Sequence, residues 1–321
     1  MDKYISVGVI ILNYNSSELT IRCAESIFRV CKFKKFRIYI VDNCSTDQSM
    51  EKLNDVYGNH EDVEIIQSKV NGGYSYGNNI GLQRAVADGC SYIAIANPDT
   101  YLINDAISIL VDALEKNNDS SIAGPFLQQP NSMGQFTRIP LNYYSSIWEK
   151  GILRKIKRKK TKSMRNHEWD GKSFIKFDGM VAGCFFVVNA SDIKRMDYFD
   201  DDFFLYYEED VLAYKMKKIE RKSIIDTSAK VYHDHAASTL VRGNGFVYFH
   251  YRVSEFLLLC KYANMKTYQR LIIYFRNILW FFVFVLCQKD ARKYLKKLLD
   301  CYHNIFIGKY EYVNQNKYTD M

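Results

Sequence analysis

The sequence predicts an α/β domain with a mostly parallel central sheet and helices on both faces. Apolar runs of strand length alternate with amphipathic runs of helix length over the first third of the chain. This alternation is typical of βαβ units, in which a helix connects two parallel strands. Polar clusters follow the apolar runs, at the carboxyl ends of the predicted strands, and ligands bind at these ends in such sheets.

The elements follow in order from local signals. Apolar runs predict strands, and Ser or Thr before an amphipathic run predicts the N-cap of a helix. The predicted strands are residues 6–12, 37–42, 63–67 and 92–96. The predicted helices are residues 18–30, capped by Ser16 or Ser17; a helix capped by Ser45 or Thr46 and ending near Tyr57; a helix ending near Asp88; and residues 104–116.

Beyond Gly124 the alternation is less regular. Residues 176–189 are rich in strand formers, the second half of 196–218 has helical spacing, and helical patterns dominate from Phe246 onward. We therefore expect an α/β domain over residues 1–240 and a C-terminal helical region over 241–321, which could also associate with a membrane.

The composition narrows the class of protein. The chain has 321 residues, 48% of them hydrophobic and 25% charged, which suits one large domain with an appendage and excludes global disorder. A net charge of +8 favours an anionic partner. The cysteines have neither zinc-like nor disulfide-like spacing, so we expect reduced thiols in a cytosolic protein.

The sequence also bears on membrane association. No signal-peptide pattern opens the chain, where a strand follows Met1 almost at once. The longest apolar run, Ile278–Cys287, is shorter than the roughly 20 residues that span a bilayer. The aromatic and basic segment around it is expected to be either a core helical hairpin or an interfacial anchor.

A carboxylate directly follows one predicted strand. Pro98 ends the run 92–96, and Asp99 then lies on the ligand-binding rim. A lone Asp at this place is often a cap or turn residue. Asp42, however, ends a neighbouring strand in the same way, and the stretch that follows it suits hydrogen bonding to a base or ribose. In residues 71–81, N-G-G-Y-S-Y-G-N-N-I-G, glycines allow close backbone approach and the amides suit an anion.

Taken in order, these motifs resemble the family 2 inverting glycosyltransferases. The resemblance extends from Ser6 to Leu240 and rests on I-I-L-N-Y-N, V-D-N-C-S-T-D, N-G-G-Y-S-Y-G-N-N-I-G, N-P-D, V-A-G-C-F-F, F-F-L-Y-Y-E-E-D and H-D-H-A-A-S. The subgroup most resembled comprises rhamnosyl- and galactofuranosyltransferases of bacterial surface polysaccharides such as O-antigen or capsule.

The resemblance implies a GT-A fold and a dTDP- or UDP-linked sugar donor. It also implies a glycan or lipid-linked glycan acceptor, Mg²⁺ or Mn²⁺ as the cofactor, and peripheral contact with the inner face of the cell membrane. It implies no nucleic-acid partner.

The resemblance also implies roles for individual residues. Asn13 and Asn15 would line the nucleotide pocket, and Asp42 would hold the base. The nucleotide-sugar site would be shaped by Asn71, Gly72, Tyr74, Asn78 and Asn97. Gly183 would let the backbone approach the sugar, although a packing requirement explains this glycine equally well.

The metal site is implied at Asn97-Pro98-Asp99, where the family has a D-x-D motif. Asn97 replaces the first acid, so Asp99 would carry most of the negative ligation. His233 corresponds to a family histidine near the same site, and its alternative is an ordinary hydrogen-bonded histidine. His235 is the lesser candidate.

The catalytic base is expected in Glu208-Glu209-Asp210. A carboxylate there would accept the proton of the acceptor hydroxyl. An acidic first turn favoured by the helix dipole is the alternative interpretation. Counting back from Leu212 assigns the base to Glu209, whereas a literal E-D match assigns it to Asp210; we take Glu209 as the first candidate.

Three rival functions remain. A sugar nucleotidyltransferase would carry a basic, glycine-rich loop after its first strand. In this chain no Lys or Arg lies between the end of that strand and Arg22. A non-catalytic protein that binds anionic polymers would leave the rim carboxylates unexplained. A protein that binds a nucleotide sugar without turnover is the third alternative, because Asn97 replaces an acidic residue of the metal motif. The basic run Arg154–Lys162 is either a solvated loop or a contact for anionic lipid or a lipid-linked diphosphate.

Overall fold

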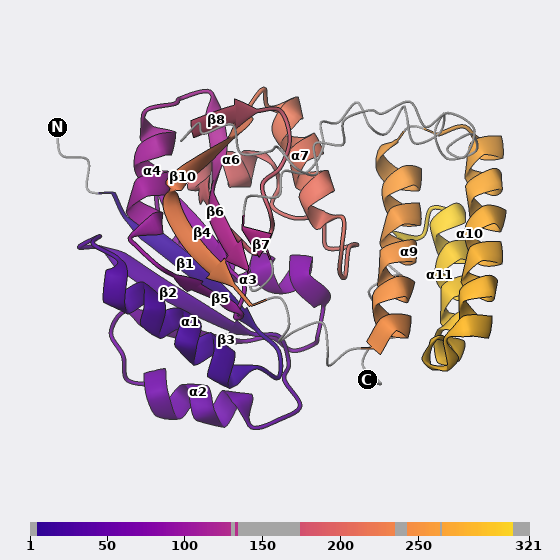
Figure 1. The fold of residues 1–321 in the computed structure, drawn as a ribbon, viewed down its shortest axis with the longest axis horizontal. Helices are drawn as coiled ribbons and strands as arrows, with labels where there is room; N and C mark the ends of the chain where they lie inside the picture. Colours follow the sequence, from indigo (N-terminus) through magenta and orange to yellow (C-terminus); the bar gives the residue numbers. More distant parts are fainter. Residues whose placement is uncertain (1–4, 130–131, 134–173, 235–242, 264, 311–321) are drawn as a thin grey trace.

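The fold is built on a single mixed β-sheet with helices on both faces (Figure 1). It is seen in a computed structural model, which describes residues 5–129, 132–133, 174–234, 243–263 and 265–310. Within these ranges the sheet has ten strands, in the order β3-β2-β1-β4-β9-β6-β10-β5, with β7 beside β6 and β8 beside β10.

The bounds of the strands are as follows: β1 Val7–Asn13, β2 Phe36–Asp42, β3 Val63–Gln67, β4 Tyr92–Ala96, β5 Thr100–Leu102, β6 Ser120–Gln129, β7 Ser132–Met133, β8 Phe174–Phe177, β9 Phe185–Asn189 and β10 Lys222–His233. The predicted strands 63–67 and 92–96 have the predicted bounds. Strand β1 differs from the prediction by one residue at each end, and β2 by one residue at its start. The α/β architecture is confirmed.

The first half of the sheet is parallel and positions the rim. Strand β1 pairs in parallel with both β2 and β4, and β2 pairs in parallel with β3. Asn13 is in register with Asp42 across the first of these pairs. The carboxyl ends of these strands therefore meet at one edge, as parallel pairing requires.

The second half of the sheet brings in antiparallel pairs. Strand β9 is antiparallel to β4 on one side and to β6 on the other. Strand β10 is parallel to β6 but antiparallel to β5 and β8. The run F-F-V-V in β9 is buried on both faces, which suits a central strand.

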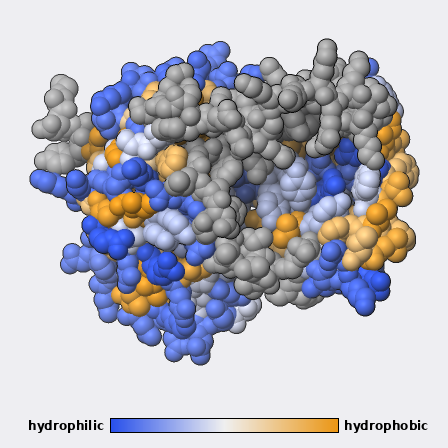
Figure 2. All heavy atoms as spheres, viewed as in Figure 1, coloured by the Kyte–Doolittle hydropathy of each residue, from blue (hydrophilic) through white to orange (hydrophobic). Residues whose placement is uncertain are grey.

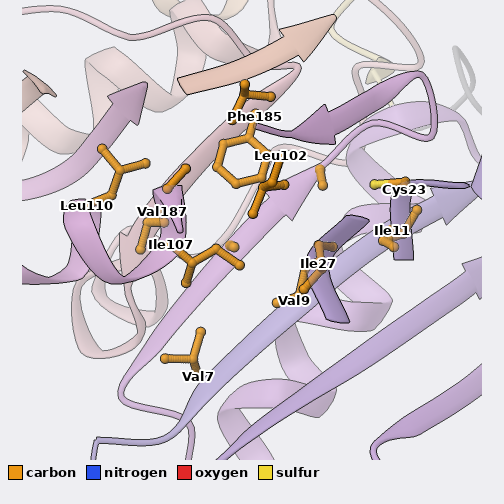
Figure 3. Close-up of a cluster of buried hydrophobic side chains, with 14 of the residues drawn as sticks. Val7, Val9, Ile11, Cys23, Ile27, Leu102, Ile107, Leu110, Phe185 and Val187 are labelled. Carbon is orange, nitrogen blue, oxygen red and sulfur yellow. The ribbon is translucent and has the colours of Figure 1, made fainter. Parts of the chain in front are cut away.

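Both faces of the sheet are buried. Alternate side chains of β1 belong to different clusters: Val9 and Ile11 pack on one face and Ile10 on the other. The first face is covered by α1 (Ser17–Val30) and α4 (Ala106–Glu115), and Figure 3 shows side chains of this cluster. The second face is covered by α3 (Gly73–Ala87), α6 (Ala190–Arg195) and α7 (Glu208–Lys218). Helix α2, Ser49–Tyr57, lies beside α1 and β3.

A helical region follows the sheet and packs beside α7 (Figure 1). It consists of α9 Gly243–Tyr262, α10 Thr267–Cys287, the 3₁₀ helix η1 Lys289–Tyr294 and α11 Leu295–Phe306. Its core includes Phe203, Phe204 and Val211 from the preceding region. The predicted domain boundary at 240 lies outside the described residues.

Helix α10 is longer than the apolar run suggested. Among the described residues it is the helix that is long and apolar enough to cross a membrane, as judged by length and composition alone. The run Ile278–Cys287, predicted to be too short to span a bilayer, is the last part of this longer helix, which begins eleven residues earlier, at Thr267.

Candidate active site

The ends of β1 and β2 are joined by a buried hydrogen-bond network. Asn13 Nδ2 donates to Asp42 Oδ1 over 2.8 Å and to Ser45 Oγ over 3.1 Å. The Asp42 carboxylate also accepts from the backbone N–H of Ser45 over 2.9 Å and from its hydroxyl. Asp42 is 0% exposed, so its carboxylate lies beneath the rim and supports it through these hydrogen bonds to Asn13 and Ser45.

Asn15 fastens the loop after β1 to the loop after β2. Its side-chain oxygen accepts from the Thr46 N–H over 2.8 Å, and its amide donates to the Thr46 hydroxyl over 3.1 Å. Its φ of 50° is in the left-handed region, which Asn tolerates better than most residues. The two loops therefore form one unit at the rim.

This arrangement corrects one detail of the prediction. Ser45 or Thr46 was expected to cap α2, but α2 begins at Ser49. The Ser45 hydroxyl instead contacts Asp42 and accepts from the N–H of Asn15 over 2.9 Å. The hydroxyl that could cap a helix is therefore already used within the rim.

The glycine-rich loop lies next to this unit. Asn71 Oδ1 accepts from Asn43 Nδ2 over 2.9 Å, and Asn43 Oδ1 accepts from the Gly72 N–H over 3.3 Å. Gly73 has a φ of +82°, and a Cβ there would lie 2.2 Å from the carbonyl oxygen of Phe204. Glycine is required at this position for both reasons.

Asn78 lies one helical turn beyond Tyr74 on α3. Its Nδ2 donates to the Tyr74 carbonyl over 2.9 Å. The side chain is 1% exposed, and its Oδ1 has no hydrogen-bond partner among the residues that the structure describes. A buried amide oxygen of this kind can accept one further hydrogen bond.

Asp99 lies in a tight turn that β4 enters and β5 leaves. The N–H and hydroxyl of Thr100 both donate to the Asn97 carbonyl, over 3.0 and 2.7 Å. Asp99 is 5% exposed, and its Oδ1 lies 3.4 Å from Nε2 of His233, the last residue of β10. The turn therefore brings together the two residues that were predicted to hold a metal.

The surroundings of His233 favour its charged form. Burial alone would lower the pKa of this imidazole, but its contacts with Asp99 and Cys184 outweigh burial and raise the pKa to about 10. An imidazolium beside a carboxylate satisfies the buried Asp99 charge.

The donor set at Asp99 and His233 fits a divalent cation that also binds an anionic ligand. One carboxylate oxygen and one imidazole nitrogen suit Mg²⁺ or Mn²⁺ when phosphate oxygens and water supply the remaining ligands. His233 would have to lose its proton before its nitrogen could bind the ion. In the described part of the chain no group of three or more His, Cys, Asp or Glu side chains is arranged to hold a metal. The ligand would therefore have to complete the site.

The dipeptide Gly183-Cys184 connects the Asp99 turn to the start of α7. The Cys184 carbonyl accepts from the Asn97 N–H over 2.8 Å. The Gly183 N–H donates to Glu209 Oε1 over 3.1 Å, and the Gly183 carbonyl accepts from the Tyr74 hydroxyl over 2.7 Å. Burial and the charges of Glu208 and Glu209 hold the pKa of Tyr74 well above its ordinary value, so its hydroxyl stays protonated and donates.

The chain turns sharply just before the three acidic residues. Tyr206 and Tyr207 both have left-handed φ values, 70° and 68°, which cost about 1–2 kcal/mol per residue. Both rings pack against Tyr251 of α9, with centroids 6.1 and 5.0 Å away. The contacts with the helical region thus stabilise the left-handed backbone conformation of Tyr206 and Tyr207, after which α7 begins at Glu208.

The acidic residues differ in their environments. Glu208 is buried, whereas Glu209 and Asp210 are partly exposed. All three lie in the first turn of α7, where the helix dipole favours negative charge. Glu209 accepts a hydrogen bond from the Gly183 backbone N–H, which holds its carboxylate next to the Asp99 turn.

Some sequence predictions lie outside the described residues, and some contacts had no signal in the sequence. His235 and the basic run Arg154–Lys162 belong to the first group. The second includes the Phe204 carbonyl, which accepts from the Tyr74 N–H over 2.7 Å, and the Cys184 carbonyl. Backbone acceptors leave no trace in residue identity, so only the fold reveals them.

Comparison with known families bears directly on this site. The model described as "Glycosyl transferase family 2" matches residues 8–190, more than half of the chain. The chain belongs to glycosyl transferase family 2. The family that the sequence motifs indicated is thus confirmed. The rhamnosyl- or galactofuranosyltransferase subgroup stays a prediction.

Two curated relatives agree with the family. The chain is 25% identical over 213 residues to the low-salt glycan biosynthesis hexosyltransferase Agl10 of Haloferax volcanii, covering 66% of this chain and 62% of Agl10. It is 27% identical over 136 residues to glycosyltransferase GlyG of Streptococcus pneumoniae, covering 42% of this chain and 43% of GlyG. The chain therefore matches less than two thirds of the length of either relative.

Solved structures support the fold. GalNAc-T7, solved with UDP, GalNAc and Mn²⁺, aligns with a TM-score of 0.55 and 12% identity, over 80% of this family 2 chain and 51% of that chain. Residues 1–349 of S. aureus TarS, solved with UDP-GlcNAc, align with a TM-score of 0.51 and 16% identity, over 84% and 70%. The GT-A fold is confirmed.

Proposed function

We propose that this protein is an inverting glycosyltransferase that moves a sugar from a dTDP- or UDP-linked donor to a hydroxyl of a surface glycan or lipid-linked oligosaccharide. One observation carries the proposal: Gly183-Cys184 bonds to the Asp99 turn on one side and to Glu209 on the other. A diphosphate site and a basic carboxylate are the two parts that such a transfer needs.

The donor would bind along the connected loops of the rim. Asn13 and Asn15 hold the first loops together, and the base would lie over the unit that Asp42 supports. Asn71 and Gly72 would present backbone to the nucleotide sugar, and the free Oδ1 of Asn78 would accept one of its donors. Family membership and neighbours solved with UDP or UDP-GlcNAc support this assignment.

Asp99 and His233 would hold a divalent cation, with Asn97 at the edge of the site. When bound, such a cation supplies charge neutralisation for the departing nucleoside diphosphate. The Mn²⁺ in GalNAc-T7 supports a divalent ion of this kind. Because Asn97 cannot supply a negative ligand, we expect the ion to bind weakly without nucleotide.

Glu209 would be the general base. The acceptor hydroxyl oxygen forms a bond to the anomeric carbon while the bond from that carbon to the diphosphate oxygen breaks. The hydroxyl proton passes to the carboxylate, and the nucleoside diphosphate leaves with the bonding electrons. Attack from the face opposite the leaving group inverts the anomeric configuration. The Gly183 N–H holds one carboxylate oxygen, which leaves the other for the proton.

The location of the enzyme is also part of the proposal. The C-terminal helical region would hold the enzyme at the cytoplasmic face of a membrane, where a lipid-linked acceptor is available. The exposed apolar residues of α10 support this assignment. We expect no nucleic-acid partner.

The donor site can be tested by calorimetry with UDP and dTDP, each with and without Mn²⁺. We expect nucleotide binding that depends on Mn²⁺ and is lost in Asp99→Ala. It should be retained in the matched variant Asp55→Ala, which removes an exposed carboxylate from α2. If neither nucleotide binds the wild type under any condition, the proposed function is wrong. The anomeric configuration of the product, read by NMR, tests inversion.

A further inference from the structure

One face of α10 is apolar and open to solvent. Its most exposed side chains are Phe275, Leu279 and Leu286, at 64, 65 and 68%. The rest of this face consists of Tyr268, Leu271, Ile272, Trp280, Phe282 and Val283. We call these nine residues the α10 face. Figure 2 shows an apolar area at the edge where Figure 1 places α10.

The opposite side of the same helix is packed. Ile273, Asn277, Phe281 and Val285 are buried against α9 and its neighbours. The helix is therefore fixed to the protein along one side and presents aromatic and aliphatic side chains along the other. Large contiguous apolar patches on a soluble surface mark sites of interaction.

Charge surrounds the α10 face but does not interrupt it. Helix α10 contains no acidic residue, and its two arginines, Arg270 and Arg276, bond to protein groups. The segment directly after it is strongly basic, with Lys289, Arg292, Lys293, Lys296 and Lys297 against one acid, Asp290. An apolar face with tryptophan and phenylalanine, next to basic residues, is typical of helices that lie in a membrane interface.

We propose that the α10 face binds an anionic lipid bilayer, with α10 lying in the plane of the interface and the basic segment 289–297 on the lipid headgroups. The proposal deepens the proposed function by naming the surface on which the enzyme works, although vesicle binding itself does not depend on catalysis. Apolar burial and charge attraction together give the affinity.

A transmembrane orientation conflicts with the packing beneath α10. Arg252 donates to Glu255 over 2.9 Å, and Arg276 lies 3.9 Å from the same carboxylate. Asn277 on α10 adds a bond of 3.5 Å to Glu255. If α10 crossed the bilayer while packed in this bundle, it would carry a network of charges into hydrocarbon, which costs several kcal/mol.

The bundle that carries the α10 face is joined to the region before α7. The Ser254 hydroxyl donates to the Leu205 carbonyl over 2.7 Å, and His250 stacks on Phe204 at 4.7 Å. Lys261 Nζ pairs with Asp200 at 2.7 Å. Binding of a membrane at α10 would therefore hold the protein in a fixed orientation. The candidate base Glu209 would then lie at a defined distance from the lipid surface.

The test is sedimentation of the full-length protein with vesicles of phosphatidylcholine, with or without phosphatidylglycerol. We expect binding to the anionic vesicles and little to the neutral ones. Phe275→Glu should lower partitioning by about tenfold or more, since an apolar side chain is lost from the interface. Lys293→Gln/Lys296→Gln should lower it by about 30-fold, at about fivefold per cation. Val56→Glu is the matched control, because Val56 is 50% exposed on α2.

A second measurement determines how deeply α10 lies in the bilayer. Fluorescence quenching of the wild type, compared with Trp280→Phe, should be strong with lipid brominated near the headgroup and weak with lipid brominated near the chain end. Strong quenching at the chain end would overturn the in-plane orientation. Equal vesicle binding by wild type and Phe275→Glu would overturn the proposal, as would self-association that Phe275→Glu abolishes without affecting vesicle binding. UDP binding should be unchanged in Phe275→Glu, which keeps this test independent of the donor site.

Discussion

Replacing Gly183 by alanine tests the position of the Glu209 carboxylate most directly. A Cβ at residue 183 would lie 2.6 Å from Glu209 Oε1, 2.9 Å from its Cγ and 3.0 Å from its Cδ. All three atoms belong to one movable side chain. The carboxylate oxygen would have to recede by about 0.8 Å to reach an ordinary contact distance of 3.4 Å.

The expected result separates catalysis from stability. A catalytic group misplaced by about 1 Å costs on the order of 100-fold in rate, so we expect kcat to fall by about 100-fold. The free energy of unfolding should change by less than about 1 kcal/mol, because the three atoms nearest the new methyl group belong to a side chain that can move. The dissociation constant of UDP should stay within about twofold, since the donor loops are untouched.

The assay is steady-state transfer or donor hydrolysis, combined with urea unfolding of the same variant. Gly89→Ala is the matched control: its φ is +77° and no atom lies within 4 Å of the added Cβ. It should lose about 1 kcal/mol of stability to backbone strain and keep its kcat. If Gly183→Ala retains the wild-type kcat while Glu209→Gln is inactive, the held position of Glu209 is irrelevant to catalysis and our reasoning fails.

Three further predictions concern the same region. Glu209→Gln should lower kcat by about 10²–10⁴ without weakening UDP binding, and Asp210→Asn by less than about tenfold; the reverse order in these rates would assign the base to Asp210. Gly73→Ala should destabilise the protein by at least about 2 kcal/mol in urea unfolding, from its φ and from contact with the Phe204 carbonyl, and unchanged stability would contradict that geometry. Tyr74→Phe should cost about 1–2 kcal/mol by leaving the Gly183 carbonyl without its donor, and a thermal midpoint equal to the wild type would show that this bond is not formed.

The parallel half of the fold was predictable because its signals are local. The apolar runs at Val63–Gln67 and Tyr92–Ala96 are bounded by turn residues, and the strands have those bounds. Ser45 was misread because a hydroxyl before a helix and a hydroxyl in a rim network look alike in sequence. The place of β9 between β4 and β6 depends on pairing between distant segments, which no local pattern encodes.

The candidate site divides in the same way. The residue types at Asp99 and His233 could be identified from motifs, and the structure brings the two within 3.4 Å. The link from Gly183 to Glu209 runs through a backbone N–H, so the sequence offered only a glycine with two equally good explanations. The sequence likewise could not decide between Glu209 and Asp210 as the base. The hydrogen bond from the Gly183 N–H to Glu209 supplies a physical reason to prefer Glu209.

The insertion of β9 has a consequence for the order in which the protein forms. Strands β1 to β4 come from the first 96 residues and can pair while the ribosome is still making the rest. Strand β6 cannot join them through the sheet until β9, residues 185–189, has been synthesised and has closed a long loop. Helix α7 follows β9 in the chain. The nascent chain should therefore form the half that we propose binds the nucleotide before it has the candidate base, Glu209.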